Sequence, residues 1–272
     1  MYILKKHIKR LISNSLSKIT NYSTNCVTVL MFHDVPASLQ NSFYELVKIL
    51  NQKYQILSCD EFHLFLDGKL KSNSKKIFIT FDDGFYSNYI VSKQILNPLN
   101  INALFFILPK FINSHKGDME SFVINSMFNG SNPNNMHQND MRPMSWEDIA
   151  ELIKDGHSIG GHTNSHSRLS TMNDKSILHE ELISSANYIE KKLNIEVKDF
   201  AYPFGSISSI NSNAMKMAKK RYYYIYSGVR GTNYVHTNKS ALRREVINLK
   251  DNLEFNLSII NGGLSILSLI HI

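Results

Sequence analysis

Short apolar segments alternate with longer helix-like segments along most of this chain of 272 residues. The segments CVTVLMF (26–32), KIFITF (76–81) and NALFFIL (102–108) are compact apolar runs, typical of buried strands. Between them lie stretches with helical periodicity, such as 43–50 and 86–96. Strands and helices in alternation predict parallel βα units, and the length suffices for one large α/β or barrel domain.

The second half of the chain continues this alternation. SWEDIAELIKDG places Ser145 in an N-cap position and reaches Gly156 as the predicted helix end, and SIGGHT follows as a short strand and turn. A long helix is predicted over 175–193, and the later strand candidates are VKDFAYPF, YYYIYSGV and ALRREVINL. An irregular insertion at about 113–143, rich in Asn, Gly and Pro from Asn125 onward, is predicted to form a long surface loop.

Residues 1–25 differ in charge from the rest of the chain. They contain five Lys or Arg residues and no acid, with apolar residues at helical spacing, whereas the whole chain has a formal net charge of +7. This pattern predicts a basic amphipathic helix, which either lies on an anionic membrane surface or docks on its own domain. Residues 26–272 are nearly balanced in charge and lack basic and aromatic interleaving, so nucleic-acid binding is not predicted.

The sequence gives few signs of export. No apolar run approaches the roughly 18 to 20 residues of a membrane span, and the N-terminal region lacks the apolar centre and cleavage site of a secretory signal. Two cysteines, Cys26 and Cys59, are too few for a disulfide framework or a Cys-based zinc site, although they leave one bridge open. We therefore expect the protein in the cytoplasm or at the inner membrane face.

Two adjacent carboxylates, Asp82 and Asp83, directly follow the predicted strand at 76–81 and precede a glycine. Like charges at neighbouring positions repel, and neither residue has a basic neighbour in the sequence. Such a pair forms either a solvated turn or a site that holds a cation. At the carboxyl end of a strand in a parallel βα barrel, side chains converge on the face where functional sites are built.

His162 and His166, in GGHTNSH, are four residues apart. If one helical turn joins them, both imidazoles lie on one side of the chain and can bind one metal ion. This spacing alone is more often accidental or a packing feature. Together with Asp83, however, the two histidines make a three-ligand site with open positions, which suits zinc or another divalent metal such as Co²⁺ or Ni²⁺.

TFDDG, followed by a histidine pair in HTNSH, resembles the polysaccharide deacetylases, also called NodB-homology proteins or carbohydrate esterase family four. The resemblance extends from about 26 to 264. It implies a distorted (β/α) barrel of about seven strands. It also implies that Asp83, His162 and His166 bind the metal and that Asp82 is the catalytic base. A bound cation would explain why two neighbouring carboxylates are tolerated.

The family also uses an acid, which protonates the departing amine. VLMFHDV resembles the permuted subgroup in which this strand comes first, so we expect His33 to be the acid rather than His271 or His236. AYPFG corresponds to a family loop whose backbone N–H, here that of Phe204, helps to hold the oxyanion. In this loop Ala201 replaces the arginine that orients the base.

The replaced arginine has candidate substitutes in LRREV. Arg244, or Arg243 beside it, could supply the missing charge from another strand. His157, in DGHSIGG, is expected to be structural, because it precedes the strand rather than following it.

The function expected from this resemblance is metal-dependent hydrolysis of an N-acetyl group from an amino sugar of a glycan or glycolipid. Two alternatives stay open. The same kind of site can hydrolyse O-acetyl esters, whose leaving group makes less demand on the acid. A catalytically silent glycan-binding relative would keep the fold without turnover, although Asp82, Asp83 and the histidine pair favour an enzyme.

Overall fold

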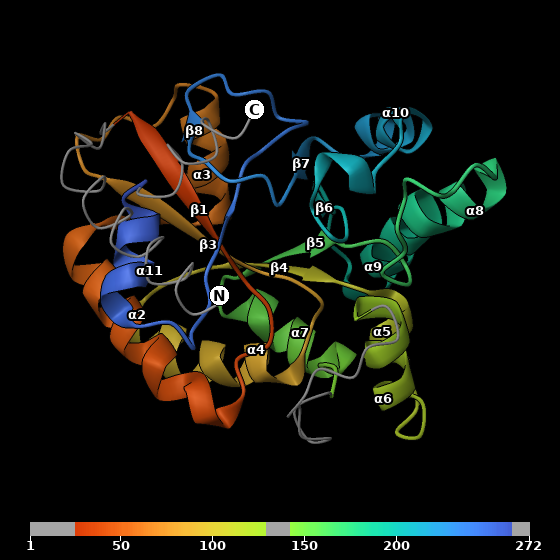
Figure 1. The fold of residues 1–272 in the computed structure, drawn as a ribbon, viewed down its shortest axis with the longest axis horizontal. Helices are drawn as coiled ribbons and strands as arrows, with labels where there is room; N and C mark the ends of the chain where they lie inside the picture. Colours follow the sequence, from red (N-terminus) through yellow and green to blue (C-terminus); the bar gives the residue numbers. More distant parts are fainter. Residues whose placement is uncertain (1–24, 129–141, 263–272) are drawn as a thin grey trace, which may run out of the picture.

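The computed structural model describes residues 25–128 and 142–262, so all but the last residue of the helix predicted over residues 1–25 lies outside the described part (Figure 1). A curled, mostly parallel sheet has the strand order β7-β6-β5-β4-β3-β1-β8, with β2 also paired to β3 and β9 to β1. The strands are β1 Cys26–Phe32, β2 Gln55–Leu57, β3 Lys76–Phe81, β4 Leu104–Ile107, β5 Ser158–Gly161, β6 Asp199–Ala201, β7 Tyr224–Tyr226, β8 Asn233–Tyr234 and β9 Glu245–Val246.

Helices connect the strands, as the alternation predicted. The α-helices are α2 Gln40–Lys53, α3 Cys59–Leu66, α4 Tyr86–Val91, α5 Pro109–Ile112, α6 Met119–Phe122, α7 Trp146–Lys154, α8 Lys175–His179, α9 Ser185–Leu193, α10 Ser212–Arg221 and α11 Leu253–Ile260. Helix α7 begins with a capping box between Ser145 and Asp148, as its sequence indicates. The predicted (β/α) barrel is confirmed as a curled, half-barrel sheet with helices around it.

Three features differ from the sequence predictions. The candidate strand ALRREVINL contributes only the two residues of β9, and β8, which was not predicted, pairs antiparallel with β1. The insertion at about 113–143 is not irregular throughout, because α6 and a π-helical segment, Val123–Met127, lie within it. Its residues 129–141 lie outside the described part. Both cysteines are free, so the possible bridge between them is absent.

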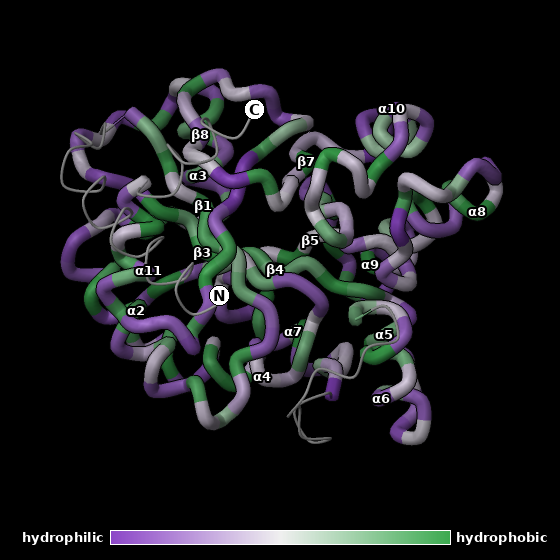
Figure 2. The backbone as a smooth tube through the Cα atoms, viewed as in Figure 1, coloured by the Kyte–Doolittle hydropathy of each residue, from purple (hydrophilic) through white to green (hydrophobic). Residues whose placement is uncertain are grey.

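The sheet separates two hydrophobic clusters. Apolar side chains of one face pack against α2, α7, α9 and α10, and those of the other face pack against α3. Figure 2 shows hydrophobic residues gathered along the central strands. In β3, Phe78 lies in the α3 cluster while Ile77 and Ile79 lie in the other, as the period of two requires. Thr80 and Asp82 follow on the same face as Phe78, which places their side chains inside the curled sheet.

Candidate active site

The residues expected to form the site lie together at the carboxyl ends of the strands. His33 follows β1, Asp82 and Asp83 follow β3, and His162 follows β5. Phe32 pairs with Phe81 and Ile107 with Gly161 in parallel register, which brings these strand ends to one edge of the sheet. The predicted convergence is therefore present.

Asp83, His162 and His166 form a group with metal-ligand spacing. The Oδ1 atom of Asp83 lies 3.4 Å from Nε2 of His162 and 3.5 Å from Nε2 of His166. All three side chains are buried, and Asp83 Oδ1 accepts no hydrogen bond from the described residues. A tetrahedral zinc centre would separate such oxygen and nitrogen ligands by about 3.3 Å. The donor set and its spacing thus fit a divalent cation such as Zn²⁺.

Backbone carbonyls fix both imidazoles in the tautomer that a metal site requires. Nδ1–H of His162 donates to the Ala201 carbonyl at 2.6 Å, and Nδ1–H of His166 donates to the Ser126 carbonyl at 2.9 Å. Because a carbonyl only accepts, Nδ1 carries the proton and the lone pair of each neutral ring is on Nε2. Both lone pairs therefore face Asp83.

A buried ion pair holds Asp82. Arg244 donates from Nη1 to Oδ1 at 2.6 Å and from Nη2 to Oδ2 at 2.9 Å. Its Nε–H donates to the Ser227 carbonyl at 2.9 Å, and its guanidinium lies 5.3 Å from the ring centre of Phe106. Of the two candidate arginines, Arg244 is the one beside Asp82, whereas Arg243 donates to the Arg230 carbonyl.

The charges of the site influence one another strongly. Burial disfavours the ionised form of Asp82, but Arg244 outweighs it and lowers the pKa of this carboxyl. For Asp83 burial is likewise outweighed, by contact with His162 and the charge of His166, and its pKa is held far below the usual range. Burial lowers the pKa of His166, so this ring is neutral near pH 7 and can act as a ligand.

His33 lies at the exposed rim of the site. Its side chain is exposed, and its charge acts on Asp82, Asp83 and His166. Its backbone carbonyl accepts a hydrogen bond from Asn88 at 2.8 Å, which fixes the end of β1. His33 can therefore meet a bound substrate.

The other histidines considered lie elsewhere or outside the described part. His236 follows β8, whose Tyr234 pairs with Cys26 at the amino end of β1, and it donates its backbone N–H to the Leu66 carbonyl. His157 accepts the Ala103 N–H at Nδ1 and contacts Asn97 through Nε2, which confirms a structural role. His271 lies outside the described residues.

Phe204 lies beside the histidine pair in an unusual backbone conformation. Its φ of 64° is in the left-handed region, and the next residue, Gly205, also has a φ of 64°. A Cβ at Gly205 would lie 2.5 Å from the backbone nitrogen of Gly228, so only glycine fits there. The Phe204 ring packs edge-on against His166 with a centroid distance of 4.8 Å, and Arg168 lies over the ring.

The sequence analysis missed Glu181, which anchors the loop between the two histidines. This buried carboxylate accepts the backbone N–H groups of Asn164 and Ser165 at 2.9 and 3.0 Å, and the Ser165 hydroxyl at 2.6 Å. Thr163 and His166 in the same loop both have positive φ. The loop is therefore not a helical turn, and the two imidazoles converge through this anchored conformation. A buried acid in an otherwise amphipathic helix was the available signal.

Comparisons with known proteins point to one family. The sequence model of the family described as "Polysaccharide deacetylase" matches residues 69–224. A curated protein, "Putative polysaccharide deacetylase YxkH" of Bacillus subtilis strain 168, is 25% identical over 201 residues, which cover 72% of this chain. The match spans 61% of the length of that protein.

Solved structures share the fold at low sequence identity. "Streptococcus pyogenes deacetylase PplD in complex with acetate" gives a TM-score of 0.66 at 19% identity, covering 86% of this chain and 98% of that one. A structure described as a de-N-acetylase from Aggregatibacter actinomycetemcomitans gives a TM-score of 0.66 at 17% identity, covering 86% and 99%. Since the family model matches more than half of the sequence, the chain belongs to the polysaccharide deacetylase family.

Proposed function

We propose that the protein is a metal-dependent hydrolase that removes N-acetyl groups from the amino sugars of a glycan or glycolipid. The observation that carries this proposal is the convergence of Asp83, His162 and His166 beside the buried pair of Asp82 and Arg244. The name of one similar fold, a de-N-acetylase, supports an amide substrate.

Each residue of the site has a task that follows from its surroundings. Asp83, His162 and His166 would hold a divalent cation, preferably Zn²⁺, which when bound supplies Lewis acidity toward water and the acetyl carbonyl. Asp82 is the base that accepts a proton from the attacking water, and Arg244 keeps its carboxylate ionised and oriented. The Phe204 N–H is the donor to the oxyanion.

His33 completes the proposal as the acid. An amine leaves an acetamide only when it is protonated, so the site needs a proton donor near the sugar nitrogen. His33 is exposed and follows β1 at the edge of the sheet where the proposed metal ligands also lie. The family match begins at residue 69 and does not include His33 or Arg244. Their roles therefore depend on position in the site alone.

Acetate release from N-acetylglucosamine oligomers tests the proposal. Metal-free protein should be inactive, and added Zn²⁺ or Co²⁺ should restore release, whereas Asp82→Asn should bind the metal and remain inactive. An O-acetylated sugar, assayed in parallel, distinguishes an esterase. Sugar binding without release of acetate from any N- or O-acetylated substrate would identify a silent relative and contradict the proposal.

Location is a separate proposal. None of the helices in 25–128 and 142–262 has the length and apolar character to span a bilayer. We propose that residues 1–25 hold the protein at the inner membrane face through their positive charge. Deleting these residues should abolish binding to anionic vesicles and spare acetate release. Equal vesicle binding by both proteins would contradict this placement.

A further inference from the structure

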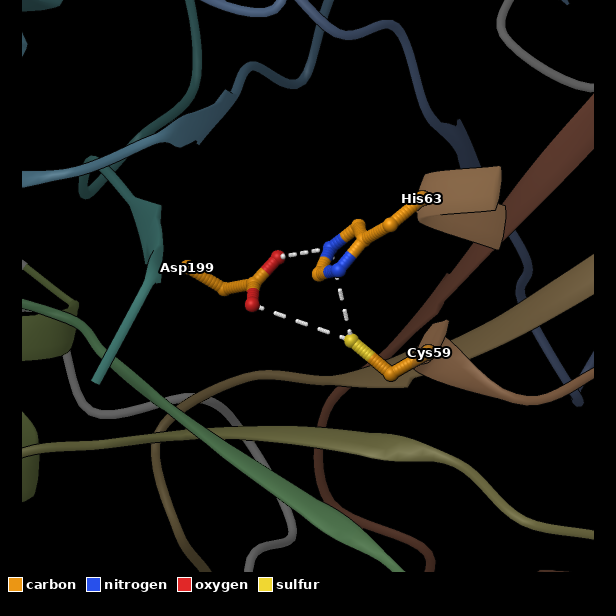
Figure 3. Close-up of side chains that lie close together, drawn as sticks. All are labelled: Cys59, His63 and Asp199. Carbon is orange, nitrogen blue, oxygen red and sulfur yellow. Dashed lines mark hydrogen bonds and ion pairs between the residues drawn. The ribbon is translucent and has the colours of Figure 1, made fainter. Parts of the chain in front are cut away.

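A second group of metal-ligating side chains lies beside the amino ends of β5 and β6, whereas the active-site residues follow the carboxyl ends of β1, β3 and β5. Cys59 and His63 are one helical turn apart on α3, and Asp199 is the first residue of β6 (Figure 3). Among the described residues, these three and the active-site group are the sets with metal-ligand spacing. Nothing in the proposed hydrolysis uses them.

The three ligand atoms form a triangle of suitable size. Sγ of Cys59 lies 3.6 Å from Nε2 of His63 and 3.7 Å from Oδ2 of Asp199, and Nε2 lies 2.9 Å from Oδ1 of Asp199. Tetrahedral zinc would separate sulfur from nitrogen or oxygen by about 3.5 Å, and nitrogen from oxygen by about 3.3 Å. A shift of a few tenths of an ångström in the carboxylate would complete this arrangement.

The arrangement does not suit a nucleophilic relay. In a relay the thiol contacts one imidazole nitrogen and the carboxylate contacts the other. Here Cys59 and Asp199 both contact Nε2 of His63, so all three groups converge on one point. Cys59 is also only 4% exposed, which leaves little access for a substrate acyl group.

Neighbouring aromatic residues hold the ligands in place. The Tyr226 hydroxyl donates to Asp199 Oδ1 at 2.8 Å, and the His63 ring stacks on Tyr224 with a centroid distance of 3.6 Å. Hydrogen bonds to a ligating carboxylate and a fixed imidazole are the supports typical of metal centres.

A cavity of about 200 Å³ is lined by all three ligands and offers space for a fourth ligand. His157 also lines it, but both its ring nitrogens are already hydrogen-bonded.

We propose that Cys59, His63 and Asp199 form a second divalent-cation site, which Zn²⁺ suits best and in which the fourth position faces the cavity. Thiolate, imidazole and carboxylate together favour Zn²⁺ over Mg²⁺ or Ca²⁺. Binding replaces the thiol proton of Cys59, which leaves to solvent, and one ion then joins α3 to β6. The site lies at the amino end of β6, whereas Asp83 follows the carboxyl end of β3, and it does not depend on the proposed hydrolysis.

Titration of the metal-free full-length protein with Co²⁺ tests this site. A thiolate bound to Co²⁺ gives a charge-transfer band in the near ultraviolet, and the Asp83 site contains no sulfur. Because the chain has two cysteines, the matched variants are Cys59→Ser and Cys26→Ser. We expect the band in the wild type and in Cys26→Ser, and its loss in Cys59→Ser. Asp199→Asn should weaken the Co²⁺ affinity measured through the band at least tenfold.

Metal content gives an independent readout. We expect two Zn²⁺ ions per wild-type chain, one in Cys59→Ser and one in Asp83→Ala, with the thiolate band retained in Asp83→Ala. Retained Zn²⁺ binding at the Asp83 site shows that Cys59→Ser is folded. Absence of the band at saturating Co²⁺, or its persistence in Cys59→Ser, would overturn the proposal and leave the cluster as a polar contact between α3 and β6.

Discussion

The guanidinium of Arg244 and the carboxylate of Asp82 form a two-bonded pair between segments 162 residues apart in the sequence. Arg244 is fully buried and Asp82 is 3% exposed, so neither charge has water as an alternative partner. Asp82 and Asp83 are adjacent in the sequence, and Arg244 gives Asp82 a positive partner of its own. The pair thus reduces the repulsion between the two neighbouring carboxylates. One is held by an arginine of the chain, and the other faces the two imidazoles.

This pair predicts that Arg244→Lys lowers kcat by on the order of 100-fold while metal content is retained. Lysine keeps the charge but cannot make two parallel bonds, so the base loses its orientation. Acetate release with zinc-loaded protein measures the effect, and Arg243→Lys is the matched control. An unchanged kcat in Arg244→Lys would show that orientation of Asp82 is unimportant.

The same pair predicts a large loss of stability in Arg244→Met. Removal of one partner leaves Asp82 buried and unpaired, at a cost of about 3 to 5 kcal/mol in the free energy of unfolding. Urea unfolding near neutral pH measures this cost. Because the folded-state pKa of Asp82 is lowered in the wild type, its ionisation there contributes stability that is full above the unfolded pKa of about 4 and is lost as pH falls through the lower folded value. Arg244→Met lacks this contribution, since burial then raises the pKa of Asp82, so the difference between the two proteins should shrink as pH falls.

The contacts of Glu181 predict that a change at this residue lowers the metal affinity of the site, although Glu181 is not itself a ligand. Glu181→Gln replaces one oxygen of a carboxylate that accepts two hydrogen bonds at Oε2 and one at Oε1, so the loop carrying His162 and His166 loses part of its support. We expect Zn²⁺ affinity to fall roughly 10- to 100-fold. The exposed neighbour Glu180, changed to Gln, should leave affinity unchanged. Equal affinities in both variants, measured by chelator competition, would contradict the anchoring role.

The main strands could be predicted because their signals are local. The runs at 26–32 and 76–81 are apolar and rich in β-branched or aromatic residues, and both match the observed strands residue for residue. Strand β8 has two residues, too few to show any periodicity, and it depends on its partner β1. Strand β9 is equally short, so the longer apolar pattern around it overstated its length.

The two candidate sites show the same difference between local motifs, which the sequence reveals, and contacts between distant segments, which it does not. TFDDG and the histidine pair are short motifs, and parallel strands bring them together predictably. The choice of Arg244 over Arg243 needed the fold, because adjacent residues in an extended segment face opposite sides. Cys59 and His63 show helical spacing within CDEFHLFL, but their partner Asp199 is more than a hundred residues away. That contact depends on how α3 packs against β6, which no local pattern encodes.

His33 predicts a rate effect that depends on the leaving group. His33→Ala should lower kcat for an N-acetylated sugar about 10²- to 10⁴-fold, the usual contribution of a positioned acid. The kcat of His33→Ala for an O-acetylated sugar should fall much less, because an alcohol leaving group needs less protonation than an amine. His236→Ala, which changes an exposed histidine just after β8, is the control. Equal losses on both substrates would indicate that His33 binds the sugar rather than protonating the leaving group.

The burial of His157 predicts that the stability of the fold decreases at acidic pH, an effect that does not involve catalysis. Burial lowers its pKa to about 4, and protonated Nδ1 could no longer accept the Ala103 N–H. Between the unfolded value of about 6.5 and about 4, only the unfolded chain binds this proton, so stability falls as pH falls. Over this pH range the loss in the free energy of unfolding approaches about 3 kcal/mol.

A His157→Gln variant cannot take up this proton, so its stability should fall less between pH 7 and pH 4.5. Urea unfolding at the two pH values gives the difference for each protein. His179→Gln, an exposed histidine on α8, should behave as the wild type. A His157→Gln protein that loses as much stability as the wild type would show that this buried ring does not set the acid sensitivity of the fold.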